Sequence, residues 1–105
     1  CNMKKKKKII IPSFVKHPSE YDGVYYKGVE TKDFIFYCNY KEGDENANTV
    51  MYDRKMKLLS ANYFAFTALW DALSKNEYTH LSPYMKKVLK MPEIQEQMKE
   101  WVEED

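Results

Sequence analysis

Cysteine is scarce in this chain, which has only Cys1 and Cys38 among its 105 residues. Two cysteines cannot form a disulfide framework, and their spacing fits no zinc-binding pattern. We therefore expect a protein of a reducing compartment and predict a cytoplasmic location. Cys1 and Asn2 precede Met3 and are interpreted as residues left from cloning, with a lipoprotein that begins at Cys1 as the alternative.

Glycine and proline are also few, with three and four residues, so little of the chain resembles a linker. The sequence contains no internal repeat, and no apolar run approaches the length of about twenty residues that a membrane-spanning helix needs. We therefore predict a single domain over residues 1–105 that does not associate with membranes. A chain of this length can bury one hydrophobic core.

Arginine occurs once, at Arg54, and the formal net charge is only +1. Because arginine is the preferred residue for bidentate contact with phosphate or guanine, its scarcity disfavours sequence-specific binding of nucleic acid. Charge is nevertheless uneven along the chain, since the segment from Glu93 to Asp105 is acidic and the N-terminus is basic. Residues 1–6 are expected to form a disordered basic arm. The basic run that could contact nucleic acid, an acidic membrane surface or an acidic protein is Lys4, Lys5, Lys6, Lys7 and Lys8.

Residues 7–59 are rich in β-branched and aromatic side chains, which favour strands. Short polar connections between the apolar runs indicate antiparallel neighbours. Pro12 would place the first strand at a sheet edge or at a bulge. The expected strands are Lys7 to Val15, Gly23 to Lys27 closed by Gly28, Asp33 to Lys41, and Thr49 to Asp53 with an extension through Leu59.

Residues 60–105 change to a helical period of about 3.6. The fold class predicted is therefore α+β, with an N-terminal antiparallel meander of three to four strands packed on two to three C-terminal helices. The expected helices are Ala61 to Ser74 capped by Ser60, a helix from the Ser82-Pro83 start signal to Met91, and Glu93 to Glu104 after Pro92.

Aromatic residues are abundant, with nine Tyr, five Phe and two Trp. If helices cover one face of the meander, the other face can present tyrosines to a protein partner or to stacked bases. The interpretation that we favour for the aromatic set as a whole is core and sheet packing, with a binding surface on its exposed half as the second. The residues predicted to bind on the open face are Tyr25, Tyr37, Tyr40 and Tyr52, with Lys4 to Lys8 beside them.

Two motif-like segments do not match their families. Lys32 to Asn39 agrees with the RNP1 pattern of RNA-recognition domains at its basic residue and two aromatic residues, but it fails at three other positions. Asp44 to Asn48 places oxygen ligands as in a calcium loop. Thr49 stands where that loop requires glycine, however, and Lys55 where it requires glutamate.

Catalytic signals are absent from the sequence. His17 and His80 lie far apart, and Cys38 is in the middle of an expected strand, where a free cysteine is usually a buried apolar residue. The chain has no phosphate-binding glycine loop and no nucleophile elbow. We therefore predict no catalytic residue, no metal site and no cofactor.

The sequence favours a small non-enzymatic interaction domain. The leading hypothesis is a protein-binding accessory or inhibitor protein, because small aromatic-rich domains without motifs are common among such proteins of phages and mobile elements. The alternatives are a nucleic-acid-binding accessory protein that uses the N-terminal lysines and the sheet tyrosines, and a small enzyme without a recognisable motif. The oligomeric state is left open.

Overall fold

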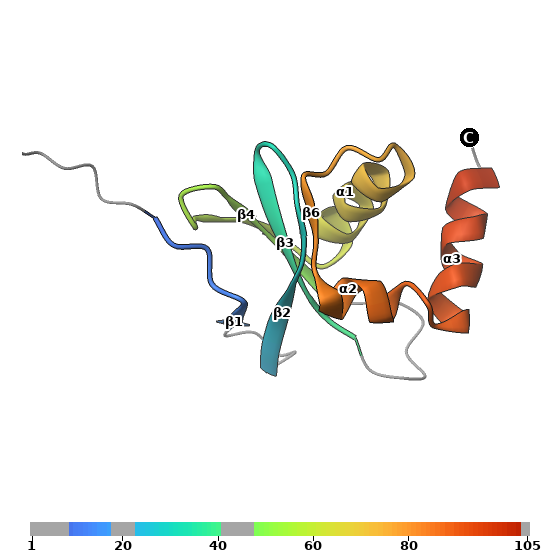
Figure 1. The fold of residues 1–105 in the computed structure, drawn as a ribbon, viewed down its shortest axis with the longest axis horizontal. Helices are drawn as coiled ribbons and strands as arrows, with labels where there is room; N and C mark the ends of the chain where they lie inside the picture. The colour runs from blue at the N-terminus through green and yellow to red at the C-terminus, as the bar shows by residue number, and fades with distance from the viewer. Residues whose placement is uncertain (1–8, 18–22, 41–47, 104–105) are drawn as a thin grey trace, which may run out of the picture.

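Strands occupy the first half of the chain and helices most of the second (Figure 1). The computed structural model describes residues 9–17, 23–40 and 48–103, with only the backbone for residues 17 and 101–103. The lysine run at 4–8 and most of the calcium-like loop lie outside the described residues. The elements are β1 (Phe14–His17), β2 (Gly23–Glu30), β3 (Phe34–Asn39), β4 (Asn48–Asp53), β5 (Leu58–Ala61), α1 (Tyr63–Ser74), β6 (His80–Leu81), α2 (Pro83–Val88) and α3 (Pro92–Glu103).

The sheet is an antiparallel meander in the order β1-β2-β3-β4-β5. This arrangement confirms the α+β class and places the helices after the meander, but the predicted number of three to four strands is wrong. A fifth strand occupies Leu58–Ala61, where we expected a strand extension and a helix start. The short β6 was not expected either, and it pairs with β2 beyond the start of β1, with Val29 opposite Leu81.

The turn between β4 and β5 explains why the fifth strand was missed. Glycine is the usual signal of a tight hairpin, and the segment from Asp53 to Lys57 has none. The Asp53 carboxylate instead accepts hydrogen bonds from the backbone N–H groups of Lys55 and Lys57, at 2.8 and 2.9 Å. Met56 adopts a left-handed backbone conformation, with φ 65°. An aspartate side chain therefore organises a turn that is normally built around glycine.

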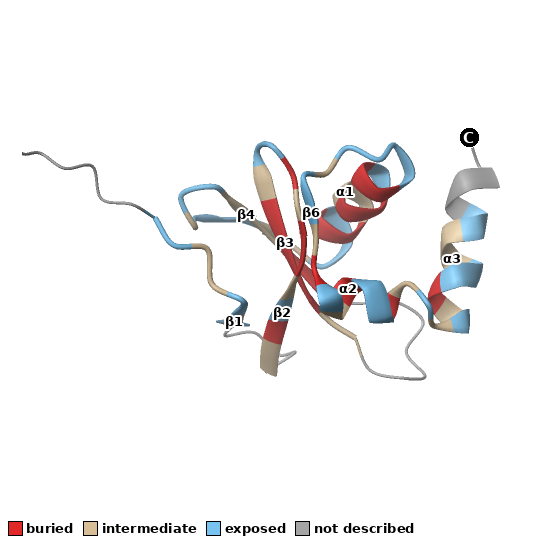
Figure 2. Cartoon of the chain, viewed as in Figure 1, coloured by how far each residue is buried: buried red, intermediate tan, exposed pale blue. Residues whose placement is uncertain are grey.

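The first face of the sheet is covered by the helices. Figure 2 shows long stretches of buried residues on β3 and α1. A Cβ atom added at Gly28 would lie 3.3 Å from the Cys38 sulfur on β3 and 3.5 Å from the terminal methyl of Met85 on α2, so the glycine leaves room for both side chains beside β2. Gly28 lies within β2, so our expectation that it closes the strand is wrong. The buried side chains of this core are Val29, Phe36, Cys38, Phe66, Leu69, Trp70, Leu73, Met85, Val88 and Ile94.

The helix starts agree with the sequence at α2 and differ at α1. The Ser82 hydroxyl accepts a hydrogen bond from the backbone N–H of Met85 at 3.1 Å, and Pro83 occupies the first helical position, as predicted. Ser60, in contrast, does not cap α1, because it lies within β5 opposite Met51. Asn62, in a left-handed conformation with φ 62°, precedes α1 and makes no side-chain capping bond.

The second face of the sheet is also buried. Its core side chains are Tyr25, Ile35, Tyr37 and Val50, none of them more than 1% exposed. The sheet curls into a half-barrel, and irregular registers in β2 and β4 favour that curvature. The expectation that this face is open to solvent is therefore wrong. The partly buried residues packed against this core are Ile11, Val15, Tyr52, Met56 and Ala61.

Candidate functional site

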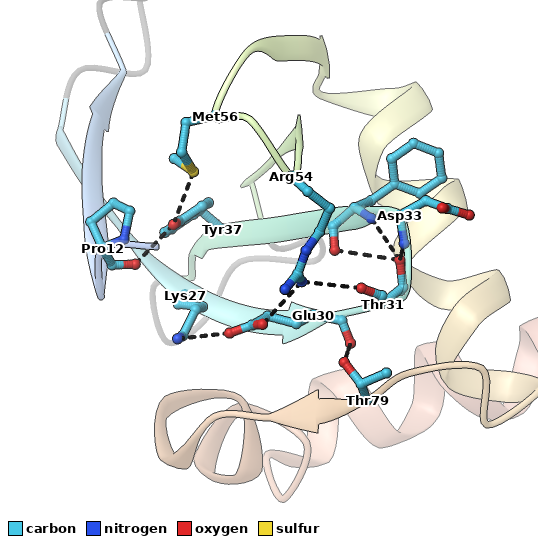
Figure 3. A network of polar contacts seen from close by, with 10 residues as sticks. Pro12, Lys27, Glu30, Thr31, Asp33, Tyr37, Arg54, Met56 and Thr79 are labelled. Atoms are coloured by element: carbon cyan, nitrogen blue, oxygen red, sulfur yellow. Dashed lines mark hydrogen bonds and ion pairs between the residues drawn. The ribbon is translucent and has the colours of Figure 1, made fainter. Parts of the chain in front are cut away.

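Tyr25 and Tyr37 lie in the core of the second face. The Tyr37 hydroxyl donates a hydrogen bond to the Pro12 carbonyl at 2.8 Å, which ties the segment before β1 to the sheet (Figure 3). Burial raises the pKa of Tyr37 to about 12, and the nearby Glu30 carboxylate adds to the shift. Neither tyrosine can reach a partner while the sheet is intact, so their prediction as exposed binding residues is wrong.

Tyr40 and Tyr52 are half-buried and belong to different faces. Tyr40 packs against the first core, and its backbone N–H donates to the Tyr84 hydroxyl at 2.9 Å. Tyr52 packs against the second core with its ring edge-to-face on Tyr37, 5.5 Å between centroids. The four predicted tyrosines therefore do not form one exposed platform. Lys4 to Lys8, which were predicted to act with them, lie outside the described residues.

A polar network at the rim of the second face was not predicted. The Glu30 carboxylate accepts hydrogen bonds from Lys27 at 2.9 Å and from Arg54 at 3.1 Å (Figure 3). Burial alone would raise the pKa of Glu30, but the two cationic donors outweigh it and lower the pKa below its ordinary value. Arg54 also donates to the Thr31 carbonyl at 3.2 Å. The only arginine thus joins the β4–β5 turn to β2.

Catalytic candidates gain nothing from the geometry. Cys38 is fully buried, and burial raises its pKa to about 12 while a hydrogen bond with Thr49 acts weakly against that shift. A thiol in this state supplies almost no thiolate at neutral pH, so Cys38 is a poor nucleophile. Within residues 9–17, 23–40 and 48–103, no three His, Cys, Asp or Glu side chains gather as metal ligands.

A cluster of exposed apolar side chains lies where β5 leads into α1. Leu58 and Leu59 are 44% and 43% exposed, and Tyr63 and Phe64 are 69% and 73% exposed. We call these four residues the edge patch. The left-handed backbone of Asn62 turns the chain from β5 into α1 and leaves Tyr63 and Phe64 on the outer side of the first helical turn. Their rings meet edge-to-face at 5.8 Å.

The edge patch adjoins an open edge of the sheet. β5 is the last strand of the meander, and within the described part of the chain no strand pairs with its outer edge. The sequence from Leu58 to Phe64 contains neither a charged residue nor a proline. We expected Leu58 and Leu59 to extend the preceding strand and Ser60 to cap a helix from Ala61, which is why the patch was missed. The alternation signal of β5 is only four residues long.

Other exposed apolar side chains lie toward the opposite edge of the sheet, on and before β1 and on β2. Phe14 and Tyr26 are register partners on β1 and β2, and Tyr26 also contacts the ring of Tyr84 at 5.2 Å between centroids. Ile9 and Ile10 are exposed as well, and they directly follow residues that the structure does not describe. The edge patch, in contrast, lies wholly inside the described segment 48–103.

A cleft of about 560 Å³ opens between the β2–β3 turn and the C-terminal half of α1. We call it the hairpin cleft. Its apolar wall includes Phe34, Ala68 and Ala72, and the segment 76–79 closes one side. Asp33 and Glu77 are among its exposed lining residues, which we call the mouth of the cleft. This cleft joins residues from distant parts of the chain, so no local sequence pattern could have indicated it.

None of the described helices is both long enough and apolar enough to cross a lipid bilayer.

Comparison with known proteins gives no relative: no protein family, curated protein or solved structure matches this chain.

Proposed function

We propose that this chain is a non-enzymatic protein-binding domain, and that the edge patch is its main contact surface. The observation that carries the proposal is the exposure of Leu58, Leu59, Tyr63 and Phe64 beside the open edge of β5. Large apolar side chains that stay exposed within one short segment of a folded domain are candidates for a contact site. A domain of this type would act as an accessory or inhibitor protein.

The mode of contact that suits this surface is strand addition. An extended segment of a partner protein would pair with the backbone of β5 and so extend the sheet by one strand. Alternate side chains of that segment would lie along Leu58 and Leu59, because side chains in a strand point to opposite faces in turn. Tyr63 and Phe64 would provide the aromatic anchors, a residue class that often dominates binding free energy.

Support also comes from what β5 lacks. Natural edge strands usually carry lysine, proline or inward-pointing charge, which prevents unwanted pairing with other chains. Between Leu58 and Phe64 no residue of these kinds is present, and Lys57 is the nearest charge before the segment. An apolar edge segment without charge or proline favours a partner at this position.

The two alternatives have less support. Binding of nucleic acid through sheet tyrosines loses Tyr25 and Tyr37 to the core, and the edge patch offers no cation to a phosphate. An enzyme without a recognisable motif would need a reactive group in a cleft, and the buried thiol of Cys38 does not meet that need.

Site-specific photo-crosslinking tests the proposal. A photoreactive phenylalanine analogue replaces Phe64, and the protein is produced in cells of the source organism. In a control variant of the same chain, the analogue replaces Glu96, an exposed position on α3. We expect a discrete protein adduct from position 64 and none from position 96. The adduct should disappear when Leu59→Lys places a charge on the β5 edge. Identical adducts from both positions, adducts with nucleic acid, or none at all would refute the proposal.

A further inference from the structure

The hairpin cleft is a second surface with its own chemistry. It is bounded by the β2–β3 turn on one side and by α1 on the other, and its volume of about 560 Å³ falls within the range of ligand pockets in proteins. Small residues create the space, because Ala68 and Ala72 face the cleft from successive turns of α1. A larger side chain at either position would occupy part of the cleft.

The interior of the hairpin cleft is apolar and aromatic. Phe34 and Phe36 contribute rings that meet edge-to-face at 6.4 Å, and Tyr78 lines the cleft from the segment after α1. The Thr31 hydroxyl, at the turn, is already engaged, since it accepts from the backbone N–H of Phe34 at 2.8 Å. The interior therefore suits an aliphatic stem, and the faces of its aromatic rings can attract a cation. It offers few hydrogen-bond donors to an anion.

The mouth of the hairpin cleft carries more negative than positive charge. Asp33, Asp71 and Glu77 line it, and Lys32 is the only cation among the lining residues. Lys75 pairs with Asp71 at 3.1 Å. In the described part of the chain, the carboxylates of Asp33 and Glu77 form neither a hydrogen bond nor an ion pair. Two carboxylates are thus available to an incoming cation.

We infer that the hairpin cleft binds a basic side chain, lysine or arginine, presented by a peptide segment of another protein. The aliphatic stem would lie against Ala68 and Ala72, and the cationic end would lie near Asp33 and Glu77. An apolar wall with carboxylates at its rim complements a side chain that is itself apolar along its stem and charged at its end. An aliphatic residue lacks the charge, and an acidic residue has the wrong sign.

This inference does not depend on the proposed function, because the two surfaces use different residues. They nevertheless share α1: Phe64 belongs to the edge patch, and Asp71 lies at the mouth of the hairpin cleft. Seven residues of helix separate them by about 10 Å along the axis. A single partner segment could therefore contact both surfaces, with apolar residues at one end and a basic residue at the other.

Titration with short peptides tests the inference. The probes are three acetylated and amidated tripeptides with central lysine, arginine or norleucine, and norleucine has the stem of lysine without its ammonium group. Backbone amide shifts of the 15N-labelled protein are followed at residues 31–34 and 76–79. We expect lysine and arginine peptides to bind about three- to thirtyfold more tightly than norleucine, from an exposed ion pair and a cation–π contact together.

Matched variants connect that preference to the carboxylates. In the double variant Asp33→Asn, Glu77→Gln, the lysine, arginine and norleucine peptides should bind with about equal affinity. The amide shifts of the other residues check that this variant is folded. The control variant Glu96→Gln, Glu100→Gln removes two exposed charges on α3 and should keep the preference.

Three results would overturn the inference: equal binding of norleucine and lysine, no shifts at the hairpin cleft, or a preference that survives the double variant. A failed titration leaves the photo-crosslink at Phe64 unaffected. Conversely, Leu59→Lys should abolish the crosslink without changing the titration, so the two proposals fail separately.

Discussion

The two faces of the sheet are buried by different means. Helices cover the first face, with Leu69 and Trp70 of α1 packed over Phe36 and Cys38. The second face is covered by the meander itself, which curls so that the segment before β1 and the β4–β5 turn pack over Tyr25 and Tyr37. A sheet with helices on only one side can therefore still lack an open face. In this molecule the available surface lies at the edge of the sheet.

Removing one aliphatic side chain from each core tests whether both faces of the sheet are packed. Ile35 and Leu69 are both fully buried, Ile35 in the second core and Leu69 in the first. We expect Ile35→Ala and Leu69→Ala each to lower the free energy of unfolding by about 2 to 5 kcal/mol, since each leaves a cavity in a packed core. Unfolding in urea, followed by circular dichroism, provides the measurement.

Leu59→Ala is the control for that pair, because Leu59 is an exposed leucine of the edge patch. It should cost less than about 1 kcal/mol, as substitutions at exposed positions usually do. If Ile35→Ala cost no more than Leu59→Ala, the second face would not be a core, and the open platform expected from the sequence would return.

A second, smaller effect concerns the cover of the second face. Tyr37→Phe removes the hydroxyl that donates to the Pro12 carbonyl and leaves the ring in place. We expect a loss of about 1 kcal/mol and faster amide hydrogen exchange in residues 9–16. Tyr52→Phe is the matched control, because within the described residues the Tyr52 hydroxyl has no hydrogen-bond partner. Equal effects from the two variants would contradict the assigned role of the Tyr37 hydroxyl.

The smallest effect depends on pH and concerns the rim of the second face. The pKa of Glu30 is lowered in the folded protein from its ordinary value of 4.5, so its contribution to stability is present above that value and is lost as pH falls through the folded pKa. At pH 7 Glu30→Gln should cost about 0.5 to 1 kcal/mol.

The difference between Glu30→Gln and the parent protein should shrink as the pH falls from 5 towards 3 in urea titrations. Asp71→Asn, which breaks the exposed pair with Lys75 on α1, should cost less than about 0.5 kcal/mol at pH 7. A Glu30→Gln deficit that stays constant over this pH range would mean that the carboxylate charge is not what joins Arg54 to β2.

Local patterns predicted the class of the fold and several of its elements. The central strand β3 and the Ser82-Pro83 helix start follow directly from their residues. β3 also carries a second signal, because Ile35, Phe36, Tyr37 and Cys38 form an unbroken apolar run, which is typical of a strand buried on both faces. Alternation alone predicts one face inside and one face outside, but both sets of side chains in β3 are largely apolar.

Local sequence patterns could not predict the two candidate surfaces. The edge patch depends on β5 being the last strand of the sheet, which follows from the turn made by Asp53 and not from the composition of Leu58–Ala61. The hairpin cleft depends on how α1 packs beside the β2–β3 turn, which brings Asp33 close to Glu77 across more than forty intervening residues. Both are properties of tertiary packing.

Hydroxyl-radical footprinting of the native protein tests the central claim most directly, because it compares side chains inside the curled sheet with those of the edge patch in one experiment. Tyr63 and Phe64 are 69% and 73% exposed, whereas Tyr25 and Tyr37 are 1% and 0% exposed. We predict that Tyr63 and Phe64 oxidise many times faster than Tyr25 and Tyr37, and that the difference disappears in denaturant. Similar rates for Tyr37 and Tyr63 in the native protein would contradict the account, because the second face would then be open to solvent.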